Sequence, residues 1–555
     1  MRTFATFLLL AICSMAPAQL VIDGRVAMFD EQTNMLLATV SEECFNNTVT
    51  LSVNSGKDWN SCTIDGKSIG DSLTFNNITA ESTFIVNYFD SNGKKNNATL
   101  KFTFLPLLQL QGTFGYDYEE GTLLLSSPDA PQTDTLEATV KWRGGTTNAE
   151  NKHKRNYKIK LKKNKSLLGM RNDDSWILDA GQADVFRLRN RIAMDLWNDI
   201  ASPPYYIDRE PAARNGVSGK VVEVFLNNEY RGIYNFSENL DRKQMRLKKV
   251  QDGEVHGCLY KGKSWQHTQM FDTLKTYDNY SETLEGYEVK YPDLNDNDTT
   301  DWHPLVAANN FTIQSHRQEF EEHVSDYFDI EPMIDYSVFL TATNAVDNSG
   351  KNMFWAVYDK AVSGRLTLAP WDLDATFGQR WGGLLDDMNG LASPLCLTDV
   401  NVWVFYNLYK YNTNGFNDRL NQRYRELRQP GQPLSTDSLQ ARFTQYYESL
   451  KNSGAAERET HRWSGDSDLN GEEIDFDKEY NYICSWIGLH MKLVDILGFP
   501  VVYTQEYFEQ LNVSMPTAPS HSDAVYTLSG QRTQKNCHLK PGIYIRQGKK
   551  IMIRR

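Results

Sequence analysis

The sequence predicts an α+β protein in which a small all-β module precedes a larger mixed domain and a short β module ends the chain. Three observations carry this prediction: alternating apolar and polar runs near the start, strands mixed with helical spacing in the middle, and a strand–turn–strand pattern at the end. A chain of 555 residues is also too long for one ordinary core, so several domains are expected.

The chain begins with features of a secretory signal peptide, which we place at residues 1–18. An apolar run precedes Ala16-Pro17-Ala18, a small-x-small cleavage pattern, so the mature chain would start near Gln19. Cys13 would also suit a lipoprotein signal, but Ile12 stands where a small residue is usual, and plain cleavage is preferred. We therefore expect a secreted or cell-surface protein. No later stretch reaches the roughly 18 consecutive apolar residues of a membrane span, so no transmembrane span is expected.

Residues 19–105 predict a β-sandwich-like module. Residues Thr48–Val53 alternate in polarity, and turn signals such as Asn54-Ser55-Gly56 separate runs of this kind. Cys44 and Cys62 form the only disulfide pair that the sequence suggests, because export permits disulfides and both lie in this β-like stretch.

The mixed domain is predicted over residues 106–500. Its first part contains strand-like runs, a helical pattern over Asp184–Ile200, and a hairpin signal in which Asn227-Asn228 joins two apolar runs. Helical patterns dominate its second part. We predict strands at Glu137–Trp142, Tyr157–Leu161, Val221–Leu226, Tyr230–Tyr234, Met353–Tyr358 and Arg365–Ala369, and further helices at Glu319–Phe328, Glu331–Asn344, Tyr424–Leu427 and Tyr480–Leu497.

The stretch most informative about chemistry surrounds the last two predicted strands. Asp347 is followed five positions later by Asn352, and after the predicted β-hairpin come Asp372 and Asp374. This order is that of a kinase site, in which the first Asp orients or deprotonates the acceptor hydroxyl while the Asn and the later Asp hold Mg²⁺ through hard oxygen ligands. Asp347 and Asn352 alone fit an ordinary turn equally well. Two carboxylates so close together favour a metal site, unless a cation such as Arg380 neutralises them.

A phosphoryl-transfer site also needs cations for the nucleotide phosphates. Lys158 and Lys160 alternate with apolar residues and so share one face of a strand, from which either could reach the phosphates of ATP. The alternative is a solvated basic face, because other lysines surround them. Upstream, Arg143-Gly144-Gly145-Thr146-Thr147 could form a phosphate-facing loop, since glycine permits close backbone approach.

Together these segments resemble the CotH (spore coat protein H) kinase-like family over roughly residues 106 to 500. The motifs that carry the resemblance are Lys141-Trp142-Arg143-Gly144, Arg155–Leu161, Asp174–Leu178, Leu188-Arg189-Asn190, Val222–Asn227, Gly232-Ile233-Tyr234 leading to Glu238, Asp347 with Asn352, and Trp371-Asp372-Leu373-Asp374. The resemblance implies an atypical protein-kinase-like domain that binds Mg-ATP and phosphorylates serine in secreted or coat proteins.

The resemblance also implies residue roles. On the family pattern Asp347 is the catalytic Asp, Asn352 and one of Asp372 or Asp374 are metal ligands, and Lys158 or Lys160 is the nucleotide lysine.

The chain departs from the family pattern in two places. The usual Arg-Gly-Asn loop has Gly145 in place of Asn, which leaves Arg143 as the candidate on that loop. The helix over Asp184–Ile200 has no Glu to pair with the nucleotide lysine, so Glu223 or Glu238 is the candidate partner.

Residues 520–555 form the predicted C-terminal β module. The segments Leu528-Ser529-Gly530-Gln531, Leu539–Ile545 and Gly548-Lys549-Lys550 resemble the type IX-like sorting tails of exported Bacteroidota proteins. This resemblance again implies a surface or extracellular destination.

The formal charge of −13 argues against nucleic acid as a partner, because phosphate contacts need basic surface. We expect a secreted or surface protein as the substrate. The alternative function is a non-catalytic surface protein that binds glycan or protein on a kinase-like scaffold. A glycoside hydrolase is disfavoured, because Asp372 and Asp374 are too close in sequence for its carboxylate pair.

Overall fold

The computed structural model describes residues 20–56, 59–89, 92–263, 271, 273–386, 402–501, 525–527, 542–546 and 549–553. The predicted signal peptide at residues 1–18 lies outside this range. The chain divides into two compact units, Met1–Pro500 and Val501–Arg555. Among the helices within the described ranges, none is both long and apolar enough to cross a membrane.

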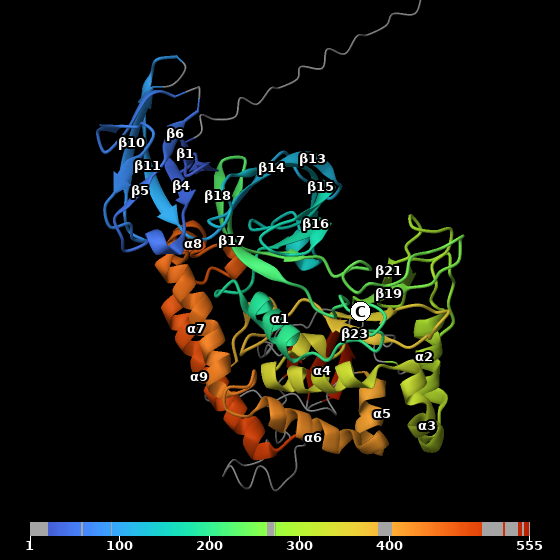
Figure 1. Ribbon diagram of the computed structural model, residues 1–555. Coiled ribbons are helices and arrows are strands. Elements are labelled where there is room, and N and C mark those ends of the chain that lie inside the picture. The colour runs from blue at the N-terminus through green and yellow to red at the C-terminus, as the bar shows by residue number, and fades with distance from the viewer. Residues whose placement is uncertain are drawn as a thin grey trace, which may run out of the picture. The chain divides into compact units, whose positions relative to one another are not determined.

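The first unit is mixed α/β, with sheets in its N-terminal part and helices in its C-terminal part (Figure 1). The first strands form a six-stranded sheet in the order β3-β4-β11-β10-β7-β8, a three-stranded sheet β2-β1-β6 and the pair β5-β9. These strands are β1 (Leu20–Ile22), β2 (Arg25–Val26), β3 (Met28–Asp30), β4 (Met35–Thr39), β5 (Val49–Leu51), β6 (Val53–Ser55), β7 (Asn60–Ile64), β8 (Lys67–Ser68), β9 (Leu73–Phe75), β10 (Phe84–Phe89) and β11 (Lys95–Thr103).

The disulfide suggested between Cys44 and Cys62 is not formed, and both thiols are free. Cys62 lies on β7 with its side chain buried, whereas Cys44 ends a short 3-10 helix, Glu42–Cys44. Sharing a β-rich stretch of sequence therefore did not bring the two side chains together.

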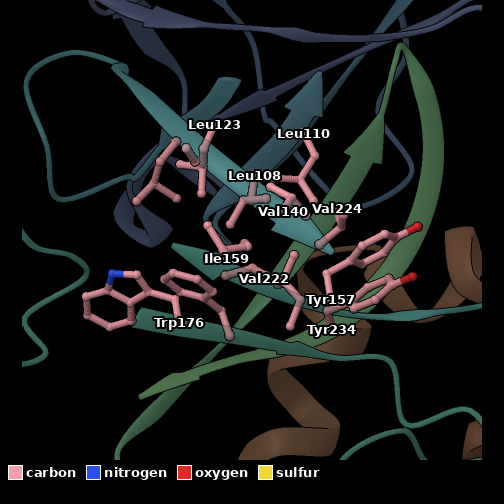
Figure 2. Packing of buried hydrophobic residues seen from close by; sticks show 14 of the residues in the cluster. Leu108, Leu110, Leu123, Val140, Tyr157, Ile159, Trp176, Val222, Val224 and Tyr234 are labelled. Carbon is pink, nitrogen blue, oxygen red and sulfur yellow. The ribbon is translucent and has the colours of Figure 1, made fainter. Parts of the chain in front are cut away.

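The next strands close into a barrel in the order β12-β13-β14-β15-β16-β18-β17. Its core is filled by alternate residues, as Figure 2 shows for Tyr157, Ile159 and Trp176. The strands are β12 (Leu107–Gln111), β13 (Glu119–Ser126), β14 (Asp134–Arg143), β15 (Asn156–Ser166), β16 (Asn172–Asp179), β17 (Gly219–Leu226) and β18 (Glu229–Glu238).

The predicted hairpin is present between β17 and β18. Asn227 and Asn228 have φ values of 50° and 63°, the left-handed conformation that a tight two-residue turn requires and that Asn tolerates.

The helix predicted from Asp184 begins later, at Arg189, and forms α1 (Arg189–Ile200). The Asp184 carboxylate accepts hydrogen bonds from the backbone N of Phe186 (2.9 Å) and Arg189 (2.8 Å). It therefore holds a turn ahead of the helix, because Asp competes for nearby backbone donors.

A further sheet, called the second sheet below, has the order β20-β21-β19-β22-β23, and its strand β23 packs against α4. Figure 1 shows α1 between the barrel and α4, and these two helices are in contact. The strands are β19 (Cys258–Gly262), β20 (Thr283–Leu284), β21 (Tyr287–Tyr291), β22 (Met353–Val357) and β23 (Thr367–Pro370). The helices are α2 (His303–Gln314), α3 (Arg317–Tyr327), α4 (Ile330–Thr343), α5 (Trp403–Tyr411), α6 (Phe416–Leu427), α7 (Thr436–Asn452), α8 (Ala455–Trp463) and α9 (Phe476–Leu497).

An apolar cluster joins the N-terminal sheet to the barrel. Met28, Met35 and Leu37 of β3 and β4 pack with barrel residues that include Leu107 and Phe225, and the last two are fully buried. The first sheet and the barrel therefore share part of one core.

The described residues of the second unit form three strands in the order β24-β25-β26, namely β24 (Val525–Thr527), β25 (Gly542–Arg546) and β26 (Lys549–Ile553). Most of the linking residues of the predicted sorting pattern, including Leu528–Gln531, lie outside the described residues.

Candidate functional site

The predicted acidic residues come together because a β-hairpin joins their two segments. Helix α4 ends at Thr343, Asp347 follows in a 3-10 turn, and β22 and β23 then pair antiparallel. At the open end of this hairpin the Trp371 backbone N donates to the Asn352 carbonyl at 2.9 Å. Residues that are separated in sequence therefore meet at one edge of the second sheet.

Asp347 and Asn352 are in direct contact. Asn352 Nδ2 donates a hydrogen bond to Asp347 Oδ2 at 2.9 Å, and Lys351 Nζ lies 2.9 Å from the same oxygen. Both Asp347 and Asn352 are 7% exposed. The two contacts fix the orientation of a nearly buried carboxylate.

Asn348, for which the sequence analysis predicted no role, connects the two segments by hydrogen bonds. Its Nδ2 donates to the carbonyl oxygens of Asn352 (3.1 Å) and Trp371 (2.7 Å), and its own carbonyl accepts from the Tyr336 hydroxyl (2.7 Å). Its side chain is fully buried. The Asp-Asn-Ser-Gly pattern contained it, but only the hairpin pairing shows what it holds.

The backbone is left-handed at two of the candidate ligands, with φ of 56° at Asn352 and 59° at Asp372. Asn and Asp are the non-glycine residues that adopt this conformation most readily. Sparsely populated backbone conformations of this kind cluster at functional sites.

An acidic cluster consists of Asp179, Asp347, Asp372 and Asp374. Desolvation raises the pKa of Asp372, which lines a small cavity, and Asp179 and Asp347 raise it further. The pKa of Asp374 is raised well above its usual range by desolvation and then by Asp372, Asp179 and Asp347. Asp347 is nearly buried, Asp179 and Asp374 are partly buried and Asp372 is exposed, so these carboxylates repel one another with partial screening by solvent.

Asn190 on α1 links the acidic cluster to the barrel. Its Oδ1 accepts from the Leu373 backbone N at 3.0 Å, and its Nδ2 donates to Asp179 Oδ2 at 2.7 Å. Asn190 therefore fixes the backbone between Asp372 and Asp374. The sequence motif around it was recognised, but its contacts were not predicted.

A basic cluster is defined as Arg143, Lys158, Lys261 and Lys290, and two of its members, Arg143 and Lys261, lie within electrostatic range of Asp372. Burial first, and then repulsion by Arg143 and Lys290, lower the pKa of both Lys158 and Lys261 to about 8. Asp372 opposes this shift at Lys261. The Arg143 guanidinium lies 5.1 Å from the centre of the Trp371 ring.

The structure distinguishes the two candidate nucleotide lysines. Both point outward from β15, but Lys158 is half-buried and lies near Arg143, whereas Lys160 is exposed. Lys158 is therefore the one that belongs to the basic cluster.

Lys261 and Lys290 were missed by the sequence analysis. They lie on β19 and β21, where Glu288 contacts Lys290 Nζ at 2.9 Å and Lys261 Nζ at 3.8 Å. The short apolar run before Lys261 was the one available signal, but its strand partners lie elsewhere in the chain.

Glu238 faces backbone amides instead of the basic cluster. Its Oε1 accepts from the Arg171 backbone N (3.0 Å), and its Oε2 accepts from the Ser218 backbone N (2.9 Å) and from Gln244 Nε2 (3.2 Å). These bonds occupy a carboxylate that is 4% exposed and secure the edge of β16 and β17. Glu223 pairs with Arg458, also away from the lysines.

A cavity of about 30 Å³ adjoins the acidic cluster, between Arg143, Asp179, Asn190 and Asp372. Arg191, which is 1% exposed, also lines it. Its Nη1 has no hydrogen-bond partner among the described residues. A buried guanidinium with an unused donor is the kind of group that an anion satisfies.

The donors present fit a metal–polyphosphate ligand. Asn352, Asp372 and Asp374 offer the hard oxygens that Mg²⁺ takes, and Mg²⁺ binds with few protein ligands because phosphate completes its shell. A metal would relieve repulsion within the acidic cluster, and a polyphosphate would do so within the basic cluster. No group of three or more His, Cys, Asp or Glu side chains in the described ranges is arranged to hold a metal on its own.

Residues 140–494 match the protein family described as CotH kinase protein. This range contains every residue of both clusters. The chain therefore belongs to the CotH kinase family. No curated protein matches the chain.

Proposed function

We propose that this protein is an exported kinase-like phosphotransferase that binds Mg-ATP and transfers the γ-phosphoryl group to a serine hydroxyl of a secreted or surface protein. The observation that carries the proposal is the meeting of the acidic and basic clusters at Asp372, within the family domain. Repulsion between like charges destabilises each cluster. The Mg²⁺ of Mg-ATP would neutralise the acidic cluster, and the phosphates of ATP would neutralise the basic cluster. Export is supported by the sequence of residues 1–18 and by the tail.

We assign to Asp347 the role of general base for the hydroxyl group of the acceptor serine. Its carboxylate would accept the proton of the serine hydroxyl as the serine oxygen bonds to the γ-phosphorus. The bond from that phosphorus to the bridging oxygen breaks, and ADP leaves with the electron pair. Lys351 and Asn352 hold Asp347 in place through its Oδ2.

The remaining side chains would bind and orient the nucleotide. Arg143, Lys158 and Lys261 would neutralise phosphate oxygens, and Asn352, Asp372 and Asp374 would hold the metal. Bound Mg²⁺ would supply charge neutralisation at the β- and γ-phosphates. Asn190 would keep the metal-side loop in position through Leu373.

Titration calorimetry tests the binding half of the proposal. We expect the protein to bind ATP more tightly with Mg²⁺ than without it, and Asp372→Asn to lose most of that difference because a metal ligand is removed. Asp437→Asn, an exposed residue of α7, is the matched control and should behave as the unchanged protein. Absence of nucleotide binding at millimolar Mg-ATP would end the proposal.

Transfer of labelled phosphate tests the catalytic half. Asp347→Asn should lower the transfer rate by about 100-fold or more, since general-base assistance is lost. Its affinity for Mg-ATP should stay close to that of the unchanged protein. Full transfer activity in Asp347→Asn would show that another residue serves the acceptor.

A further inference from the structure

A second charged surface lies on the barrel edge, outside the acidic and basic clusters. A groove of about 590 Å³ is lined by six basic side chains and by the two acidic side chains Asp173 and Glu210. This excess of positive charge occurs in a chain whose net charge is −13. The basic residues of this groove, called the basic groove below, are Arg171, Arg242, Lys243, Arg246, Lys248 and Lys249.

Part of this charge is not neutralised internally. Lys243 contacts Asp173 and Asp174, and Lys248 contacts Glu210 at 2.8 Å. Arg246 and Lys249 are exposed, and no hydrogen bond or ion pair engages their side chains among the residues that the structure describes. Exposed cations without partners attract an anionic ligand over the whole groove.

The basic groove begins beside the basic cluster. Arg171 Nη2 lies 3.2 Å from Asp241 Oδ1, and Asp241 is close enough to Lys158 to act on its charge. On the other side the Arg242 guanidinium lies 5.5 Å from the Tyr291 ring, next in sequence to Lys290. A ligand lying in the groove would thus continue toward the site where we place the phosphates.

We propose that the basic groove docks an acidic segment of the acceptor protein, so that the phosphorylated serine lies near Asp or Glu residues. The inference rests on the proposed function, because it assigns the groove to the acceptor. An extended acidic peptide is favoured over nucleic acid or glycan because no aromatic ring is among the described residues that line the groove. Such rings are what those ligands stack on.

Fluorescence anisotropy with labelled peptides tests docking without nucleotide. Each short peptide carries one serine, flanked by Glu, Gln or Lys. We expect the Glu peptide to bind the full chain most tightly and to weaken as salt is raised. The double variant Arg246→Glu/Lys249→Glu should weaken it by about tenfold or more, since two attractive charges become repulsive.

The matched control is Lys67→Glu/Lys95→Glu, which makes the same charge change at exposed sites of the first sheet. It should leave peptide affinity unchanged, and all three proteins should bind Mg-ATP equally. If both double variants weaken binding of the Glu peptide equally, the effect comes from the net charge of the protein, and the proposed docking site is wrong. Tighter binding of single-stranded nucleic acid or a sulfated polysaccharide than of the Glu peptide would also overturn it.

Phosphate transfer to the same peptides separates this inference from the function on which it rests. If the Glu peptide binds through Arg246 and Lys249 but is never phosphorylated, docking stands and the proposed function fails. If all peptides are phosphorylated with equal KM, the function stands and docking fails. A lower KM for the Glu peptide that is lost in Arg246→Glu/Lys249→Glu supports both.

Discussion

Lys158 and Lys261 hold their protons less tightly than ordinary lysines, and both are assigned to nucleotide phosphates. Their pKa values of about 8 follow from burial first and from repulsion by Arg143 and Lys290, opposed by Asp241 at Lys158 and by Glu288 and Asp372 at Lys261. Phosphate binds their protonated forms, so affinity is greatest below pH 8 and falls as pH rises through it.

We therefore expect ATP affinity to fall between pH 7 and pH 9 by about tenfold for each of the two lysines that contacts phosphate, since a lysine of pKa about 8 goes from mostly protonated to mostly neutral. Calorimetry at both pH values measures this change. Lys158→Gln and Lys261→Gln should each flatten the dependence, whereas Lys160→Gln, on the exposed position, should preserve it. An ATP affinity that does not change between pH 7 and pH 9 would show that neither lysine contacts the phosphates.

At this scale the sequence predicted the acidic half of the site better than the basic half. Asp347, Asn352, Asp372 and Asp374 lie in two short segments that a hairpin connects, so local pattern sufficed to bring them together. Lys261 depends on β19 pairing with β22, a partner far along the chain. Spacing along the sequence carries no information about that contact.

At the scale of elements, the packing of α8 against β18 depends on one glycine. Gly232 has φ of 87°, and a Cβ there would come within 1.9 Å of Glu459 Oε2. That oxygen accepts from the Ile233 backbone N at 2.7 Å, while Glu459 Oε1 pairs with Lys154 (2.9 Å) and Arg187 (2.7 Å). Any side chain at 232 would displace this buried network.

Gly232→Ala should accordingly lower the free energy of unfolding by about 3 kcal/mol or more, as when a buried ion pair loses its geometry. Gly253→Ala is the matched control, with φ of 80° and no atom near its Cβ position, and should cost only about 1 kcal/mol of backbone strain. Urea unfolding of both variants gives the comparison. Equal losses of unfolding free energy in the two variants would mean that the Glu459 side chain can move aside without destabilising the protein.

Element boundaries were predicted well where the turn chemistry was local. The Asn227-Asn228 hairpin is present as predicted, and α3, α4 and α9 lie within a few residues of the predicted helices, whereas α6 begins at Phe416, well before the predicted Tyr424–Leu427. The start of α1 was placed too early, because the apolar spacing continues through residues that Asp184 holds in a turn. The spacing of apolar residues detects the buried face of a helix, but it does not detect a side chain that accepts hydrogen bonds from the backbone N–H groups at the start of that helix.

At the scale of the molecule, the first sheet and the barrel share an apolar cluster, although sequence composition predicted separate domains meeting at residue 105. Removing residues 20–105 would expose Leu107 and Phe225, both fully buried. Loss of burial costs about 1.5–3 kcal/mol for each such side chain.

We therefore expect deletion of residues 20–105 to lower the Tm of the remaining family domain by several degrees or more. Deletion of residues 502–555, which form a separate compact unit, is the control and should leave that Tm unchanged. Scanning calorimetry of the three proteins measures the effect. An unchanged Tm after the first deletion would show that the shared cluster contributes little.

The small cavity beside Asp372 has a kinetic consequence. Its volume of about 30 Å³ accommodates roughly two water molecules, far less than a nucleoside triphosphate. Since Asp372 is exposed beside this cavity, a water molecule or a single phosphate oxygen could occupy the cavity while the rest of a nucleotide lies outside it. Binding would then need no opening of the fold, and the observed association rate would rise in proportion to nucleotide concentration.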